Sequence, residues 1–202
     1  MIPKILHFIW VGGAPCPYLE RLTAYRKLNP DWQINLWTDA NLPPLICERV
    51  YNRIPVPTSK ADILRLELLW RFGGVYVDID SECRRPLVEL LEECDMFFTT
   101  HRGGRKIEIG CMGAQPEHPV VGQLLIGLPK HFDELVAKLD GQLSVYWVYS
   151  YIRKQTKGAG IKQLPAHVSC LPDMATAKTY IVQDRANTFA NQVTDSKYFK
   201  VV

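Results

Sequence analysis

The stretch Ser59–Asp80, with the sequence SKADILRLELLWRFGGVYVDID, decides the fold that we expect for this chain. From Asp62 to Phe72 almost every residue is apolar or a strong helix former, which predicts a helix that is buried on most of its faces. Thr58 or Ser59 is expected to cap its first turn through a side-chain oxygen. Gly73–Gly74 is expected to end the helix, because glycine readily adopts the left-handed backbone found at helix C-termini.

Two pairs of charged residues lie inside this apolar frame. Asp62 and Arg65 are three residues apart, so they share one face of the expected helix. Val75–Ile79 has the composition of a short core strand. Asp78 and Asp80 stand at its end, two residues apart, and are expected to project to the same side while Ile79 points to the other.

The pair Asp78 and Asp80 is a candidate metal site. Two neighbouring carboxylates repel each other unless a cation or a proton lies between them, and Mg²⁺ or Mn²⁺ binds carboxylate oxygens together with substrate phosphates. At the carboxyl end of a strand such a pair predicts a metal–diphosphate site. Two solvated loop acids are the alternative interpretation, and the buried pair Asp62 and Arg65 just before them favours the site.

The order and spacing of these residues resemble the sugar-binding Asp-x-Asp region of glycosyltransferase family 32, which includes yeast-type initiating mannosyltransferases, and also the catalytic domains of glucosylating bacterial toxins. The matching pattern is Lys60-Ala61-Asp62-Ile63-Leu64-Arg65 followed by Gly73-Gly74-Val75-Tyr76-Val77-Asp78-Ile79-Asp80. A second match is the run HFIWVGG, His7–Gly13, which is similar to the first strand of the family. The resemblance covers the first half of the chain. It implies a GT-A type α/β fold: a Rossmann-like, mostly parallel sheet flanked by helices.

The rest of the chain alternates apolar strand-like and amphipathic helix-like segments. That alternation predicts a parallel sheet with right-handed crossovers. At 202 residues we expect a single domain, residues 1–202, with a nucleotide-binding half at about 1–82 and an acceptor half at about 83–202. The further expected strands are Ile5–Val11, Gln33–Trp37, Met96–Thr100, Ile107–Ala114 and one or two within Ile161–Leu171. The further expected helices are Pro17–Leu28, Leu42–Arg53, a short one from Pro86 to Glu92 or Glu93, one after Pro119, and Leu143–Gln155, with Ser81–Arg85 as a loop.

Composition excludes several classes of protein. The net charge of +3 is too small to indicate nucleic-acid binding. No apolar run reaches the roughly 18–20 residues of a membrane-spanning helix, and the first residues lack the layout of a signal peptide. We therefore expect a cytoplasmic enzyme of bacterial or viral origin, or a catalytic fragment. The cysteines form no C-x-x-C pair, so we expect free thiols in a reducing compartment; they are Cys16, Cys47, Cys83, Cys94, Cys111 and Cys170.

The resemblance assigns roles to individual residues. It implies that the metal ligands are Asp78 and Asp80, and that Arg65 acts with them in catalysis. It implies that the nucleotide sugar is bound by Trp10, Val11, Asp62, Arg65, Tyr76 and Asp78. Trp10 would stack on the nucleotide base, since an aromatic ring offers a flat face to another ring. A purely structural core position is the alternative interpretation of Trp10.

The implied reaction is transfer of a hexose from UDP-glucose, UDP-galactose or GDP-mannose to a hydroxyl of a glycan, glycolipid or glycoprotein, with Mn²⁺ or Mg²⁺ and with retention of configuration. A metal ion would stabilise the charge on the departing diphosphate. One alternative is a catalytically inactive carbohydrate- or partner-binding module on the same fold. Another is an Asp-x-Asp phosphohydrolase, which the glutamate at Glu82 makes less fitting. No general base stands out; His101, Glu108 and His118 are candidates by residue type alone.

Two departures from the family pattern leave parts of the site open. Where relatives often carry an asparagine that faces the sugar, this chain has Gly110 and Cys111. Near the C-terminus, relatives carry a His and a Ser-Trp pair that complete the metal–diphosphate site. The comparable stretch here, residues 190–197, has neither His nor Trp, and the candidate substitutes are Gln192, Asp195, Ser196 and Lys197.

Overall fold

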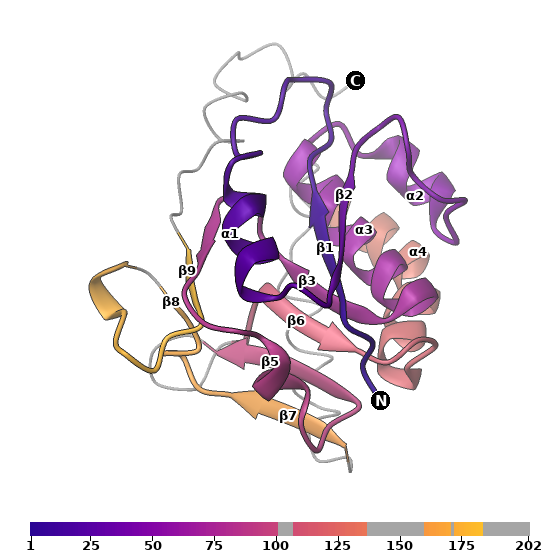
Figure 1. Ribbon diagram of the computed structural model, residues 1–202. Helices are drawn as coiled ribbons and strands as arrows, with labels where there is room; N and C mark the ends of the chain where they lie inside the picture. The colour runs from indigo at the N-terminus through magenta and orange to yellow at the C-terminus, as the bar shows by residue number, and fades with distance from the viewer. Residues whose placement is uncertain (101–106, 137–159, 171, 184–202) are drawn as a thin grey trace.

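The computed structural model describes residues 1–100, 107–136, 160–170 and 172–183 (Figure 1). In this part of the chain a six-stranded sheet has the order β2-β1-β3-β6-β5-β7, and a smaller sheet has the order β4-β9-β8. The strands are β1 (Ile5–Ile9), β2 (Gln33–Trp37), β3 (Gly74–Val77), β4 (Ser81–Cys83), β5 (Met96–Thr100), β6 (Ile107–Ala114), β7 (Ile161–Leu164), β8 (Ser169–Cys170) and β9 (Ile181–Gln183). The helices are α1 (Arg21–Leu28), α2 (Glu48–Arg53), α3 (Pro57–Phe72) and α4 (Pro119–Val136), with 3₁₀ turns η1 (Val88–Leu91) and η2 (Pro172–Met174).

The large sheet is mostly parallel, as the sequence predicted. Strand β1 pairs in parallel with β2 and β3, and β5 pairs in parallel with β7. Only β6 runs against its neighbours β3 and β5. We did not predict this reversal. Its cause lies in the connection: only residues 101–106 separate β5 from β6, whereas a parallel pair needs a crossover of a dozen or more residues.

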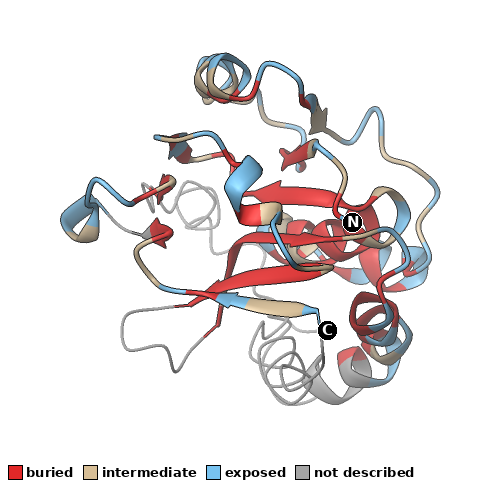
Figure 2. Cartoon of the chain, turned by 60° about the horizontal axis from the view of Figure 1, so that its bottom comes forward, coloured by how far each residue is buried: buried red, intermediate tan, exposed pale blue. Residues whose placement is uncertain are grey.

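Helices cover both faces of the large sheet (Figure 1). Side chains of α2, α3 and α4 pack with one face of the strands, where Tyr76, Phe98 and Met112 point. Tyr25 of α1 packs with the other face, where Phe97 points. Neighbouring strand residues enter opposite cores because successive side chains in a strand alternate between faces. The central strands are therefore buried on both sides, as Figure 2 shows.

Helix α3 confirms the prediction of a buried helix in the central stretch. Nine of its sixteen residues are buried. It begins at Pro57, where a proline fits because the first helical N–H has no intrahelical acceptor. The prediction that Thr58 or Ser59 caps the helix was wrong, since both lie inside it and no side chain caps its start. Gly73 ends it with φ of 63°, and its N–H donates to the Leu69 carbonyl at 3.0 Å.

Other boundaries differ from the predictions. Helix α1 begins at Arg21 instead of Pro17, and α2 begins at Glu48 instead of Leu42. Two consecutive prolines precede α2 and cannot donate backbone hydrogen bonds to a helix. The expected helix after Pro86 is only the turn η1. The expected loop after Asp80 instead contains β4, which was missed because its partner β9 lies about a hundred residues further along the chain.

Some predictions fall on residues that the structure does not describe: the helix at Leu143–Gln155, the candidate base His101 and the stretch 190–197. Within the described residues the cysteines that the structure assigns are free thiols, and three of them are buried: Cys47, Cys83 and Cys111.

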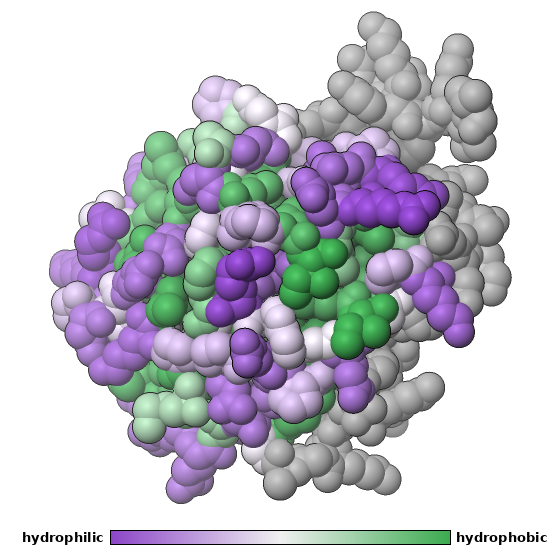
Figure 3. Space-filling view, turned by 90° about the vertical axis from the view of Figure 1, so that its right-hand side faces the viewer, coloured by the Kyte–Doolittle hydropathy of each residue, from purple (hydrophilic) through white to green (hydrophobic). Residues whose placement is uncertain are grey.

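The surface on the side of α2 and α4 mixes apolar and polar side chains (Figure 3). Its exposed apolar residues include Ile46, just before α2, and Ile126 in α4. Of the helices in the described residues, none combines the length and the apolar character that a bilayer crossing requires.

Candidate functional site

Charged residues of α3 and of the turn that follows β3 meet at the carboxyl end of β3. Arg65 lies between two carboxylates: its Nη2 is 2.7 Å from Asp62 Oδ1 and 3.8 Å from Asp78 Oδ1. Its Nη1 donates to the Ile109 carbonyl on β6 at 2.8 Å. Only 6% of Arg65 is exposed. A buried guanidinium needs such partners, because burying an unpaired charge costs several kcal/mol of folding free energy.

Tyr76 fixes the carboxylate of Asp78. Its hydroxyl donates to Asp78 Oδ1 at 2.7 Å, and its ring lies under the Arg65 guanidinium at 4.4 Å. Burial raises the pKa of Tyr76 well above its usual value, so the hydroxyl keeps its proton and remains a donor. Tyr76 is only 3% exposed. In this structure its hydroxyl therefore bonds Asp78 and does not face the solvent.

The second oxygen of Asp78 lies over the bare Cα of Gly110. A Cβ added to Gly110 would lie 2.4 Å from Asp78 Oδ2 and 2.3 Å from Gln183 Nε2. Gln183, at the end of β9, donates in turn to Ser169 Oγ at 3.0 Å. We did not predict Gln183 or Ser169 as site residues, and no local motif marks them. Gly110 itself was noted only as a departure from the family pattern.

Asp78 and Asp80 lie in a turn that follows β3. The strand ends at Val77, two residues earlier than predicted. Ile79 is nevertheless buried while both acids are partly exposed, so the predicted alternation of side chains continues through the turn. Ser81 closes the turn, since its N–H and its hydroxyl both donate to the Asp78 carbonyl.

Helix α1 supports the same turn from outside the motif. Arg21 Nη1 donates to the Asp80 carbonyl at 2.6 Å. The Tyr25 hydroxyl is 2.6 Å from Ser81 Oγ. Neither residue was predicted, because nothing in the sequence shows that the first helix reaches the turn after the third strand.

The donor set suits a hard divalent ion. Asp78 and Asp80 supply carboxylate oxygens, and the Asp78 side chain is 31% exposed. Among the described residues no group of three or more His, Cys, Asp or Glu side chains is placed to hold a metal. Two carboxylates are still sufficient protein ligands for Mg²⁺, which keeps several waters and takes phosphate oxygens from its substrate.

Asp62 lies in an electrostatically mixed environment. Burial raises its pKa to about 6, the nearby Arg65 lowers it and the charge of Asp78 raises it further. A carboxyl group with this pKa takes up a proton in mildly acidic solution. Asp62 is therefore an ionised carboxylate beside Arg65 above pH 6 and a neutral carboxylic acid below it.

Trp10 and Val11 lie in the interior. Trp10 is 4% exposed and Val11 is 2% exposed. The Trp10 ring meets Tyr18 edge to face at 5.9 Å, and its Nε1 donates to the Ala14 carbonyl at 2.6 Å. Base stacking by Trp10 stays a prediction, and it would require the ring to become exposed on binding.

The candidate general bases lie in different places. Glu108 is on β6, with its Oε1 accepting from the Gly110 N–H at 3.4 Å, close to Asp78. His118 caps the start of α4 by accepting from the Val120 N–H, and it faces Asp95 at 3.4 Å. Since Asp95 precedes β5 at the opposite end of the sheet, His118 is remote from Asp78. His101 lies outside the described residues.

Known proteins match this part of the chain. Residues 20–97 match the family described as glycosyltransferase sugar-binding region containing DXD motif. Inositol phosphoceramide mannosyltransferase 3 of Schizosaccharomyces pombe is 30% identical over 166 residues, which cover 76% of this chain and 46% of that protein. The chain carries a DXD glycosyltransferase domain. Mannosyl phosphorylinositol ceramide synthase SUR1 of Saccharomyces cerevisiae is also 30% identical, over 75% of this chain and 38% of its own length.

The fold of this glycosyltransferase domain is of the GT-A type. The PaToxG glycosyltransferase superposes with a TM-score of 0.60 at 16% identity, covering 78% of this chain and 71% of that structure. The comparisons thus confirm the family resemblance and the mostly parallel α/β fold, and the names of the relatives support the glycosyltransferase assignment. The chain spans less than half the length of the two curated relatives named here.

The prediction of a cytoplasmic enzyme of bacterial or viral origin was wrong. The curated relatives whose names specify inositol phosphoceramide or mannosyl phosphorylinositol ceramide come from two yeasts, Schizosaccharomyces pombe and Saccharomyces cerevisiae. The prediction failed because it treated the first residues of the chain as informative about location. A sequence that matches less than half of the length of these relatives carries no information about where the full protein is located.

Proposed function

We propose that this domain transfers a mannosyl residue from GDP-mannose to a hydroxyl of an inositol phosphate-bearing glycolipid, with Mn²⁺ or Mg²⁺. The observation that carries the proposal is the cluster of Asp62, Arg65, Tyr76 and Asp78, in which the buried Arg65 and Tyr76 hold the partly exposed Asp78 beside Asp80. Mannose, as opposed to glucose or galactose, is supported by relatives that are named inositol phosphoceramide mannosyltransferases. The acceptor class is supported by the same names.

The chemistry assigned to the cluster is charge stabilisation. A diphosphate leaving group carries negative charge that grows as the glycosidic bond breaks, and fixed positive charge stabilises it. Asp78 and Asp80 would hold the divalent ion, which supplies positive charge to the diphosphate when bound. Arg65, held by Asp62 and the Ile109 carbonyl, presents a preorganised guanidinium next to Asp78.

The remaining residues keep this arrangement in place. Tyr76 holds one oxygen of Asp78, and Gly110 leaves room for the other. Above pH 6 the ionised Asp62 has the acceptor capacity to bind sugar hydroxyls. We assign the nucleotide to residues of about 1–82 and the acceptor to residues of about 83–202.

The proposal is tested by calorimetric titration of GDP and of UDP, each with and without Mn²⁺, followed by assay of mannosyl transfer. We expect GDP to bind more tightly with Mn²⁺ than without it, and mannosyl transfer from GDP-mannose to require Mn²⁺. Asp80→Asn should abolish metal-dependent transfer and leave the thermal transition unchanged within a few degrees. Transfer that survives this substitution would contradict the site, and metal-dependent binding without any transfer would favour an inactive binding module.

A further inference from the structure

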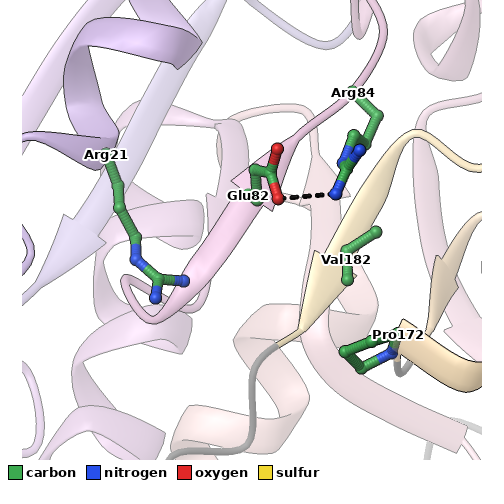
Figure 4. A pocket seen from close by; sticks show the side chains of 5 residues that line it. All are labelled: Arg21, Glu82, Arg84, Pro172 and Val182. Carbon is green, nitrogen blue, oxygen red and sulfur yellow. Dashed lines mark hydrogen bonds and ion pairs between the residues drawn. The ribbon is translucent and has the colours of Figure 1, made fainter.

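A pocket of about 360 Å³ opens beside the turn that carries Asp80 (Figure 4). Three separate parts of the chain form it: the start of α1, the strand β4 with the residue after it, and the β9–η2 region. Its lining consists of Arg21, Glu82, Arg84, Pro172 and Val182.

The small sheet explains why these residues face the pocket. Glu82 pairs with Val182 across β4 and β9, so their side chains lie on the same face of the sheet. Their neighbours Ser81, Cys83 and Gln183 are buried, and point to the opposite face, toward Asp78 and the core. The sheet thus separates a buried surface that supports the Asp-x-Asp turn from an outer surface that carries the pocket.

The charges of the pocket favour an anionic ligand. It contains two guanidinium groups and one carboxylate. Arg84 Nη2 is 2.8 Å from Glu82 Oε2. Within the described residues this is the side-chain contact that the structure gives Arg84, and a guanidinium has five N–H donors. About half of each side chain is exposed, 54% for Arg84 and 49% for Glu82, so both are accessible to a ligand.

The pocket is physically joined to the proposed reaction centre. Arg21, which lines it, donates to the Asp80 carbonyl. Glu82 follows Asp80 by two residues, and an extended chain spans roughly 7 Å over that separation. A molecule bound by Glu82 and Arg84 therefore lies about one or two sugar lengths from the turn that carries Asp78 and Asp80.

We propose that this pocket binds the phosphorylated polyol of the acceptor, with the phosphate on Arg84 and polyol hydroxyls on Glu82. This inference rests on the proposed function, because it assigns the acceptor to a place beside the donor. A guanidinium binds phosphate oxygens through two parallel N–H donors, and a carboxylate accepts from hydroxyl groups. The combination of Arg84 and Glu82 fits a polyol phosphate better than it fits a neutral sugar or a simple anion.

The test uses the full chain and three probes: myo-inositol 1-phosphate, myo-inositol and inorganic phosphate, titrated without nucleotide. We expect the ester to bind at least about tenfold more tightly than either other probe. Arg84→Gln should weaken binding of the ester by about tenfold, because it removes a charged hydrogen-bond donor. Glu82→Gln should strengthen binding of inorganic phosphate, because it removes a repelling carboxylate. General misfolding cannot produce opposite changes in two neighbouring variants.

Arg85→Gln is the matched control. Arg85 is the next arginine in the chain, but its guanidinium lies over the Tyr180 ring at 4.3 Å and bonds Glu89 at 3.1 Å, outside the pocket. Its substitution should change ester binding by less than about twofold, since it touches only surface contacts. An equal loss in the Arg84 and Arg85 variants, or equal affinity for ester and inorganic phosphate, would overturn the proposal.

A parallel titration with GDP and Mn²⁺ separates this inference from the proposed function. If GDP binds and the ester does not, the pocket assignment alone is wrong. If the ester binds with the expected dependence on Arg84 while GDP and UDP do not bind, the pocket assignment stands and the donor assignment fails.

Discussion

Gly110 is a residue whose side chain the site cannot accommodate. Any Cβ there would overlap the Asp78 carboxylate and the Gln183 amide. We expect Gly110→Ala to displace Asp78 and lower kcat/KM for sugar transfer by about 100-fold, since a misplacement near 1 Å costs that much. Steady-state kinetics at saturating Mn²⁺ provides the measurement.

Gly113→Ala is the control for this substitution, because Gly113 lies on the same strand. Its Cβ would meet the Phe97 ring at 2.4 Å instead of a site residue. This variant should lower the melting temperature but retain the transfer rate of the folded enzyme. Similar rate losses in both variants would mean that Gly110 acts through stability alone.

Tyr76 offers a finer test at the same scale. Tyr76→Phe removes the hydrogen bond to Asp78 Oδ1 and leaves the ring under Arg65. A hydrogen bond to a charged group contributes about 1.5–3 kcal/mol, so we expect at least a tenfold rise in the Mn²⁺ concentration that gives half-maximal activity. An unchanged metal requirement would show that Asp78 does not depend on Tyr76 for its position.

At the scale of elements, α3 stabilises α2 as well as the site. Both carboxylate oxygens of the buried Glu67 accept backbone N–H groups, from Ile46 and from Cys47, at the start of α2. Glu67→Ala should lower the free energy of unfolding by about 3 kcal/mol, because two buried donors lose their acceptors. Urea denaturation measures this, and the exposed Glu48→Ala should change it by less than about 0.5 kcal/mol. If both substitutions change the free energy of unfolding only slightly, Glu67 does not stabilise the start of α2.

The elements also show what the sequence could predict. The helix at α3 and the strand β6 were predicted well because their signals are local: a run of helix formers that ends at Gly73–Gly74, and a mostly apolar run at Ile107–Ala114. The pairing of β4 with β9 was not, because each strand has only three residues and their contact is distant in the chain. The site follows the same rule, since Asp62, Arg65 and Asp78 come from one stretch whereas Arg21 and Gln183 come from opposite ends of the described chain.

At the scale of the whole molecule, two buried groups affect stability in opposite directions as pH changes. Burial lowers the pKa of His7 to about 4, below the usual 6.5, so the unfolded chain binds more protons between pH 4 and 6.5 and stability rises with pH in that window. Burial raises the pKa of Asp62 to about 6, above the usual 3.8, so the folded chain binds more protons between pH 3.8 and 6 and stability falls with pH in that window.

These two contributions should largely cancel in the native protein between pH 4 and 6. In Asp62→Asn the Asp62 contribution is removed, so we expect the free energy of unfolding to rise with pH by up to about 3 kcal/mol more than in the native chain, given about 1.4 kcal/mol per pKa unit. Chemical denaturation at several pH values measures both slopes. Parallel slopes for the two proteins would contradict the raised pKa of Asp62.

His7 has a hydrogen-bond arrangement that allows one neutral form of its ring. The Trp37 Nε1–H on β2 donates to His7 Nδ1 at 3.0 Å, and His7 Nε2 is 2.8 Å from the Gly73 carbonyl at the end of α3, so its proton must lie on Nε2. The ring therefore joins three segments that meet only when the sheet is assembled. Its ¹⁵N resonances therefore report directly whether the sheet is assembled, and they should change when a substitution separates any of the three segments.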